Sequence, residues 1–111
     1  MPVRLCVLAI TVVLAVHAHG AESADALIVL TTVGYLTGAA DGCKVVPDQS
    51  NQLSSGMAIA ISRGKYGDQA QAHTLFNNAR QKGIADASAR RVDCTKVGDS
   101  VRQYVRSLLS K

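Results

Sequence analysis

The chain has 111 residues, a formal net charge of +4, no tryptophan, one phenylalanine and three tyrosines. A chain of this length forms one domain with a modest hydrophobic core, which excludes a large multidomain enzyme. The few aromatic residues are not interleaved with the basic residues, and this argues against nucleic acid as a partner.

The first twenty residues have the order of a secretory signal peptide. Arg4 supplies a positive charge, residues 5–16 are uncharged and mostly apolar, and the small residues Ala18 and Gly20 follow. An apolar run of about 12 residues is too short to span a bilayer stably. We therefore expect residues 1–20 to be cleaved, leaving a single domain over 21–111 that is periplasmic or secreted and has no stable membrane span.

The next segment, residues 25–42, has the pattern of a helix. Leu27, Leu30 and Val33 share one face of it. Its glycines recur at every fourth position, at Gly34, Gly38 and Gly42. Such a stripe lets another backbone approach closely, and we expect a second helix of the same chain to fill it. The uncharged stretch is shorter than the roughly 20 residues of a membrane span, which favours a buried core helix.

A second helix is predicted to begin near Pro47, whose fixed φ suits the first turn of a helix. It extends to about Arg63 and directs an apolar stripe inward, formed by Leu53, Met57, Ala60 and Ile61. Residues 64–68 then interrupt the pattern with two glycines.

Asp68 followed by Gln71 is a capping-box pattern that opens a third helix, predicted to reach about Val92. Asp93 or Thr95 can cap a fourth helix. The fourth helix has the plainest amphipathic stripe of the chain, at Val97, Val101, Tyr104, Val105 and Leu108. With no convincing strand, the predicted fold is all-α, a small irregular four-helix bundle.

Two cysteines, Cys43 and Cys94, remain after removal of the signal peptide. Cys43 lies at the end of the first predicted helix and Cys94 at the start of the fourth, in a chain expected to reach an oxidising compartment. We predict a disulfide between them. It would close a loop of about 50 residues and stabilise the fold by about 4 kcal/mol through chain entropy.

No set of residues predicts catalysis, a cofactor or a metal site. His73 is the only histidine of residues 21–111, and no Gly-x-Ser-x-Gly nucleophile motif is present. One histidine and two oxidised cysteines leave only scattered aspartates as metal ligands. Glu22 is the sole glutamate, and the aspartates fall mostly at helix ends, where capping explains them.

Charge is unevenly distributed along the chain. Residues 22–79 carry five acids and three bases, whereas residues 80–111 carry eight bases and three acids. A basic C-terminal half suits an acidic partner or lipid headgroups, and it equally suits the solvated faces of two helices.

Two surfaces are candidates for binding a partner protein. One is a groove lined by Leu53, Met57 and the stripe of the fourth helix, with Val101 and Tyr104. The other is the loop Arg63-Gly64-Lys65-Tyr66-Gly67-Asp68, which combines an aromatic ring, bases and flexible glycines. The same loop also fits a plain helix–helix turn in which Tyr66 covers the end of the bundle.

The order of helix ends and turns carries a family resemblance. The relevant segments are Gly34-Tyr35-Leu36 through Cys43, then Val46-Pro47-Asp48, then Gly64-Lys65-Tyr66-Gly67-Asp68, then Asp93-Cys94. This layout resembles that of the type II secretion pilotins, small helical envelope proteins of Gram-negative bacteria. The resemblance implies a module that cradles a partner helix between its own helices. Pilotins are typically lipoproteins, and this chain lacks the lipidation cysteine.

Two other groups share features with the chain. The run from Gly34 to Asp41 and the following Pro47 are similar to secreted immunity proteins that neutralise peptidoglycan amidases, which usually have a second disulfide. Acid-stress periplasmic chaperones share the size and the single disulfide, but their first cysteine precedes a helix. The sequence thus predicts a non-catalytic, exported protein-binding module of the bacterial envelope, with an immunity-type inhibitor or a periplasmic chaperone as alternatives.

Overall fold

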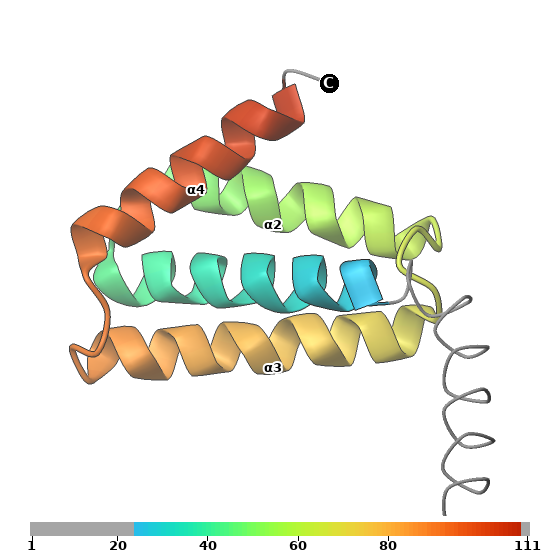
Figure 1. Cartoon of the computed structure of the whole chain (residues 1–111), viewed down its shortest axis with the longest axis horizontal. Coiled ribbons are helices and arrows are strands. Elements are labelled where there is room, and N and C mark those ends of the chain that lie inside the picture. The colour runs from blue at the N-terminus through green and yellow to red at the C-terminus, as the bar shows by residue number, and fades with distance from the viewer. Residues whose placement is uncertain (1–23, 110–111) are drawn as a thin grey trace, which may run out of the picture.

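The computed structural model describes residues 24–109, which form four helices and no strand. The helices are Ala24–Cys43, α2 (Pro47–Ser62), α3 (Gln69–Ser88) and α4 (Cys94–Leu109). The predicted all-α four-helix fold is therefore confirmed. The predicted signal peptide, residues 1–20, lies outside the described residues. Ala24–Cys43 is called the central helix below, because it lies between α2 and α3, while α4 crosses α2 at an angle (Figure 1).

The glycine stripe of the central helix is filled by α3, as predicted. A Cβ placed on Gly34 would lie 2.6 Å from the carbonyl oxygen of Phe76, and one on Gly38 would collide with the backbone of Arg80. The contact is reciprocal, since a Cβ on Gly83 of α3 would collide with the backbone of Tyr35. The two helices therefore touch backbone to backbone, which only glycine permits at these positions.

The most completely buried aliphatic side chains belong to the central helix, α2 and α4, and α3 adds the ring of Phe76, which is 7% exposed. Leu30, Val33, Leu53, Ile61 and Val101 are at most 2% exposed. Burying an aliphatic side chain of this size contributes about 1.5–3 kcal/mol relative to leaving it in water. The core thus combines a close glycine contact on the α3 side with aliphatic packing on the α2 and α4 side.

Cys43 and Cys94 form the predicted disulfide. Their Cα atoms are 5.6 Å apart and the bond joins positions separated by 51 residues. It fixes the end of the central helix to the start of α4, so the two chain segments that α2 and α3 separate are covalently joined.

One helix end differs from the sequence-based prediction. α3 ends at Ser88 and not near Val92, because Arg90 takes a left-handed conformation with φ of 59°. The amide of Arg91 then donates to the carbonyl of Asp86 at 2.8 Å and closes the helix. At the start of α4, Asp93 accepts hydrogen bonds from the amides of Thr95 and Lys96, so Asp93 is the cap and Thr95 is not.

The central helix is long and apolar enough to cross a membrane by length and composition alone. Its inward face is nevertheless covered within the bundle, where Val33, Thr37, Ala39 and Ala40 are buried. The helix is therefore a core helix on its inward face, whereas Leu27 and Ile28 near its start are exposed.

Candidate functional site

The structure separates the residues predicted to bind a partner into two groups. Leu53, Met57 and Val101 are 1%, 6% and 0% exposed and lie in the core, so α2 and α4 fill the space between them with their own side chains. Tyr66 and Tyr104 are half-buried and expose part of their rings. The binding role of all five stays a prediction, and in this conformation the two tyrosines are the members that a partner can touch.

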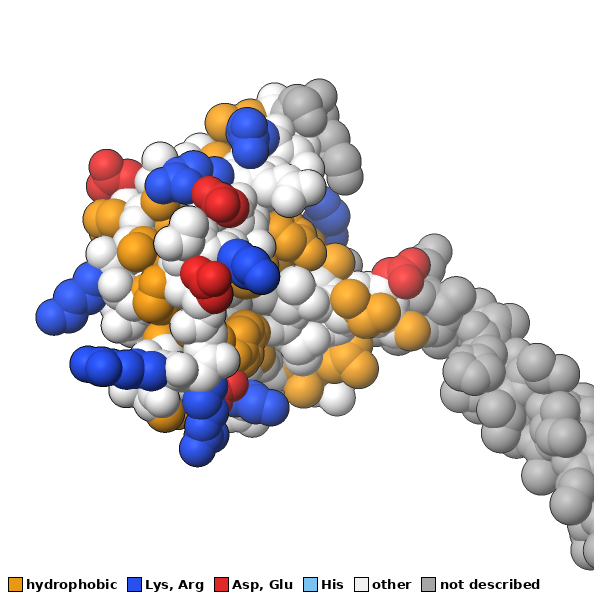
Figure 2. Space-filling view, turned by 60° about the vertical axis from the view of Figure 1, so that its left-hand side comes forward, with side chains coloured by type: hydrophobic (Ala, Val, Ile, Leu, Met, Phe, Trp, Pro, Cys, Tyr) orange, Lys and Arg blue, Asp and Glu red, His pale blue; other side chains and the backbone are white. Residues whose placement is uncertain are grey.

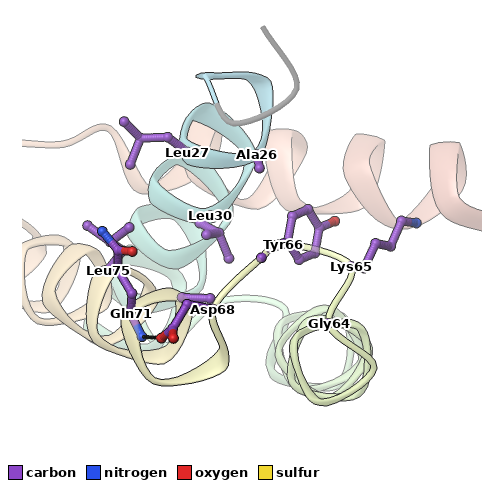
Figure 3. A pocket seen from close by; sticks show the side chains of 11 residues that line it. Ala26, Leu27, Leu30, Gly64, Lys65, Tyr66, Asp68, Gln71 and Leu75 are labelled. Atoms are coloured by element: carbon purple, nitrogen blue, oxygen red, sulfur yellow. Dashed lines mark hydrogen bonds between the residues drawn. The ribbon is translucent and has the colours of Figure 1, made fainter. Parts of the chain in front are cut away.

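A pocket of about 530 Å³ opens beside Tyr66 (Figure 3). It is here called the Tyr66 pocket and is defined by residues from three segments. These are Ala26, Leu27 and Leu30 of the central helix, Gly64 to Asp68 of the loop, and Gln71, Ala72 and Leu75 of α3. Leu30 points toward the aromatic ring, Leu27 and Leu75 line the part of the pocket further from it, and the polar groups come mainly from the loop.

The loop that carries Tyr66 is held at both ends. The amide of Lys65 donates to the carbonyl of Ala60 at 3.1 Å, which closes α2. At the other end the carboxylate of Asp68 accepts a hydrogen bond of 2.8 Å from the amide of Gln71, as the capping-box pattern predicted (Figure 3). Between them Gly64 and Gly67 take φ values of 73° and 82°, which favour glycine.

Tyr66 combines the two roles that the sequence left open. Its ring packs against the hydrophobic core and covers the end of the bundle. It also lines the pocket, and burial raises the pKa of its hydroxyl above the ordinary value of 10.0. The hydroxyl is therefore neutral at physiological pH, and the ring offers an apolar wall to the pocket.

An exposed apolar rim borders the Tyr66 pocket on the central helix. Leu27, which lines the pocket, is 44% exposed, and Ile28 beside it is 60% exposed. Two charged side chains of opposite sign, Lys65 and Asp68, lie at the opening, and both belong to the loop. The pocket therefore combines aliphatic and aromatic walls with polar groups of the loop and of Gln71.

Sequence analysis found Tyr66 but missed the aliphatic side of this pocket. The available signal was Ala26-Leu27-Ile28-Val29-Leu30, five consecutive apolar residues. Such a run covers more than one face of a helix, so some of its side chains have to lie outside the core.

Two polar clusters join the helices away from the pocket. Arg80 of α3 donates to the carboxylate of Asp41 at 2.6 Å, and the Ser50 hydroxyl of α2 donates to the same carboxylate at 3.2 Å. The Tyr35 hydroxyl donates to Asp86 at 2.7 Å, and this bond is the main reason that the pKa of Tyr35 is raised above 10.0, with burial second. These polar residues therefore connect neighbouring helices to one another.

His73, the lone histidine of residues 21–111 and predicted to have no catalytic role, is half-buried on α3 near the start of that helix. Among residues 24–109 no group of three or more histidine, cysteine, aspartate or glutamate side chains is placed to hold a metal ion. The Tyr66 pocket, at about 530 Å³, is larger than a second pocket of about 250 Å³, which is lined by Ala40, Asp41, Lys44, Val45 and Pro47.

Comparisons with protein-family models, with curated proteins and with solved structures each find no match to this chain.

Proposed function

We propose that this chain is an exported, non-catalytic binding module that takes an apolar segment of another envelope or secreted protein into the Tyr66 pocket. The observation that carries the proposal is the pocket itself, which is lined by aliphatic side chains of the central helix and α3 and by the ring of Tyr66, toward which Leu30 points. Its volume of about 530 Å³ falls in the range of ordinary binding pockets.

The way in which the pocket is built supports recognition of a protein. Tyrosine supplies a large contact area at low entropic cost, which is why it is enriched where proteins bind one another. The exposed side chains of Leu27 and Ile28 extend the apolar surface beyond the opening, so a helix or strand longer than the pocket gains further contact.

Two features support export. The sequence begins with an apolar stretch typical of a signal peptide, and the disulfide is compatible with an oxidising compartment. A pilotin-like role, in which the module cradles a partner helix, is the form of this proposal that the sequence resemblance favours.

The test uses mature protein, residues 21–111, cross-linked mildly in its own cell envelope and captured by affinity. The Leu27→Asp variant places a charge on the wall of the pocket. Ile59→Asp is the matched control, because Ile59 is 53% exposed on α2 and does not line the pocket.

We expect mass spectrometry to find one dominant partner that is lost with Leu27→Asp and kept with Ile59→Asp. Equal capture by both variants would show that the pocket does not bind the partner. A diffuse set of captured proteins would indicate a chaperone, and a captured enzyme that the protein blocks in a one-to-one complex would indicate an immunity-type inhibitor.

A further inference from the structure

We propose that the end of the bundle away from the disulfide is a lipid-contact surface, which binds the headgroup region of a bilayer through exposed apolar side chains. This surface is called the apolar end below. It is defined by the large apolar side chains that the described residues expose, which are Leu27, Ile28, Ile59, Leu108 and Leu109. The inference goes beyond the proposed function, because the occupant is lipid and not a partner protein.

These five side chains gather at one end of the molecule although three helices carry them. The central helix, α2 and α4 each have one end within four residues of a cysteine of the disulfide, at Cys43, Pro47 and Cys94. At 1.5 Å of helix rise per residue, each of the five side chains lies about 18 Å or more along its helix from that end. Figure 1 shows the start of the central helix and the ends of α2 and α4 on the side away from the start of α4. Figure 2, turned toward the disulfide end, shows charged side chains of both signs there.

The last turn of α4 shows that the apolar pattern extends past the core. Leu108 continues the helical stripe of Val101 and Val105, which are 0% and 6% exposed, yet Leu108 is 56% exposed. Leu109 beside it is 71% exposed. The stripe thus leaves an apolar turn in contact with water, and exposed apolar surface of this kind marks contact with a protein or a membrane.

The spread of the five side chains over three helix ends selects lipid as the occupant. Leu27 also lines the Tyr66 pocket, whereas the other four do not. A protein partner has to match the shape of the surface that it covers, with packing like that of a protein interior. Lipid instead deforms around separate projecting side chains, which enter the headgroup boundary by about 5–10 Å.

The predicted export route brings the apolar end close to a membrane. Residues 5–16 are the apolar stretch of the predicted signal peptide, and the central helix begins at Ala24. At no more than about 3.6 Å per residue, the chain from Val16 to Ala24 spans at most about 29 Å. The disulfide end lies about 30 Å away along the central helix. While the signal peptide is attached, the apolar end is therefore the end that the chain holds within reach of the membrane.

The charges around the apolar end are nearly balanced, so apolar contact has to drive the binding. They lie in the first turn of the central helix, the loop after α2 and the last three turns of α4. The bases there are Arg63, Lys65, Arg102 and Arg106, and the acids are Asp25, Asp68 and Asp99. Arg102 pairs with Asp99 at 2.9 Å. We therefore expect binding to zwitterionic phosphatidylcholine, with little dependence on salt.

The experiment uses the absence of tryptophan from the chain, because one introduced tryptophan then reports on one position. In the mature protein, Leu109→Trp and Ile28→Trp each place it at the apolar end. Ser88→Trp is the matched control, since Ser88 is exposed and is the last residue of α3, at the disulfide end. With vesicles of phosphatidylcholine brominated on its acyl chains, the fluorescence of Leu109→Trp and of Ile28→Trp should shift to the blue and be quenched. Ser88→Trp should keep its emission, because that end stays in water.

A second variant measures the strength of the contact. Ile28→Ser with Leu109→Ser removes two exposed apolar side chains and leaves the core and the lining of the Tyr66 pocket unchanged. Vesicle binding in a flotation assay should fall by about tenfold or more, as for the loss of two partly buried aliphatic side chains. The melting temperature should stay the same, because surface substitutions of this kind have little effect on stability.

Three results would overturn the proposal. Equal quenching at both ends of the bundle, or no vesicle binding, would show that the apolar end does not contact lipid. Binding that needs phosphatidylglycerol and disappears at high salt would indicate a contact driven by charge. A dimer in sedimentation that Leu109→Ser dissolves, without vesicle binding, would indicate a second copy of the chain as the occupant.

The two proposals fail separately. Ile28→Ser with Leu109→Ser should still capture the partner, because the residues that line the pocket are unchanged. If Leu27→Asp keeps the captured partner while tryptophan at positions 28 and 109 is quenched, the pocket proposal fails. If Leu27→Asp loses the partner but neither tryptophan is quenched, the apolar-end proposal fails.

Discussion

Gly38 shows how much of this fold depends on the absence of one methyl group. A Cβ at this position would collide with the backbone of Arg80 on α3, and a backbone cannot move aside as a flexible side chain can. We expect Gly38→Ala to lower the free energy of unfolding by about 3 kcal/mol, because overpacking outweighs the gain of about 1 kcal/mol in helix propensity. Urea unfolding followed by circular dichroism measures this difference.

Gly56→Ala is the control for that substitution. Gly56 lies within α2, and a Cβ added to it would have no neighbouring atom within 4 Å, so the extra bulk meets only solvent. The alanine variant should be more stable by about 1 kcal/mol, since only helix propensity changes. Destabilisation by both substitutions to the same extent would contradict the close contact at Gly38.

Tyr35 gives a prediction about pH. Its hydroxyl donates to Asp86, and its pKa is raised because the neutral form makes this bond. A group whose pKa is higher in the folded than in the unfolded state stabilises the fold fully below the unfolded value of 10.0. That stability is lost as pH rises from 10.0 through the folded pKa.

Tyr35→Phe should therefore be less stable than the unchanged protein by about 1 kcal/mol at pH 7, as for one lost hydrogen bond. The difference should narrow above pH 10, where the ionised tyrosine can no longer donate. Melting temperatures of both proteins between pH 7 and 11 test this. A constant difference over the whole range would mean that the hydroxyl does not stabilise the fold through Asp86.

At the scale of elements, α4 depends on its first turn. The carboxylate of Asp93 accepts hydrogen bonds from the amides of Thr95 and Lys96, at 3.0 Å and 3.2 Å, which the helix itself leaves unsatisfied. Asp93→Ala should lower the free energy of unfolding by about 1 kcal/mol.

The Asp99→Ala variant is the matched control for the free energy of unfolding of Asp93→Ala. Asp99 lies further along α4 and pairs with Arg102 on the surface, where a salt bridge of this kind contributes at most about 0.5 kcal/mol. Thermal unfolding of the two variants should therefore rank Asp93→Ala as the less stable. The reverse order would show that Asp93 does not stabilise α4 as a cap.

At the scale of the whole molecule, the disulfide supplies a large share of the stability of a small domain. With the cysteines 51 positions apart, chain entropy gives about 4 kcal/mol. Cys94→Ser should therefore melt at a markedly lower temperature than the unchanged protein in oxidising buffer and at nearly the same temperature in reducing buffer. Equal melting in both buffers would show that the cross-link does not stabilise the fold.

The glycine stripe and the cysteines illustrate what could be predicted of the fold. Gly34, Gly38 and Gly42 recur at helical spacing, so a close helix contact followed from the sequence, although the partner did not. The matching residue, Gly83, was missed, even though Ala79, Gly83 and Ala87 form a small-residue stripe of the same period. A stripe reveals that a close contact exists, whereas the identity of its partner depends on how the helices are arranged in space.

The candidate site was predictable in part. Tyr66 could be named because glycines and charges surround it in one short loop. Periodicity could not decide whether Leu53, Met57 and Val101 lie in the core or line a groove, because an apolar stripe has the same pattern whether the chain's own helix or a partner covers it.

The sequence by itself determined the four helices, the Asp68 cap of α3 and the pair of cysteines, because these depend on residues close together in the chain. Only the tertiary structure decided that Arg80 meets Asp41, that Leu27 and Leu75 line one pocket with Tyr66, and that Gly83 meets the backbone of Tyr35. Such contacts depend on the angles and spacing between packed helices, which follow from the whole set of side chains in the core and not from any local pattern.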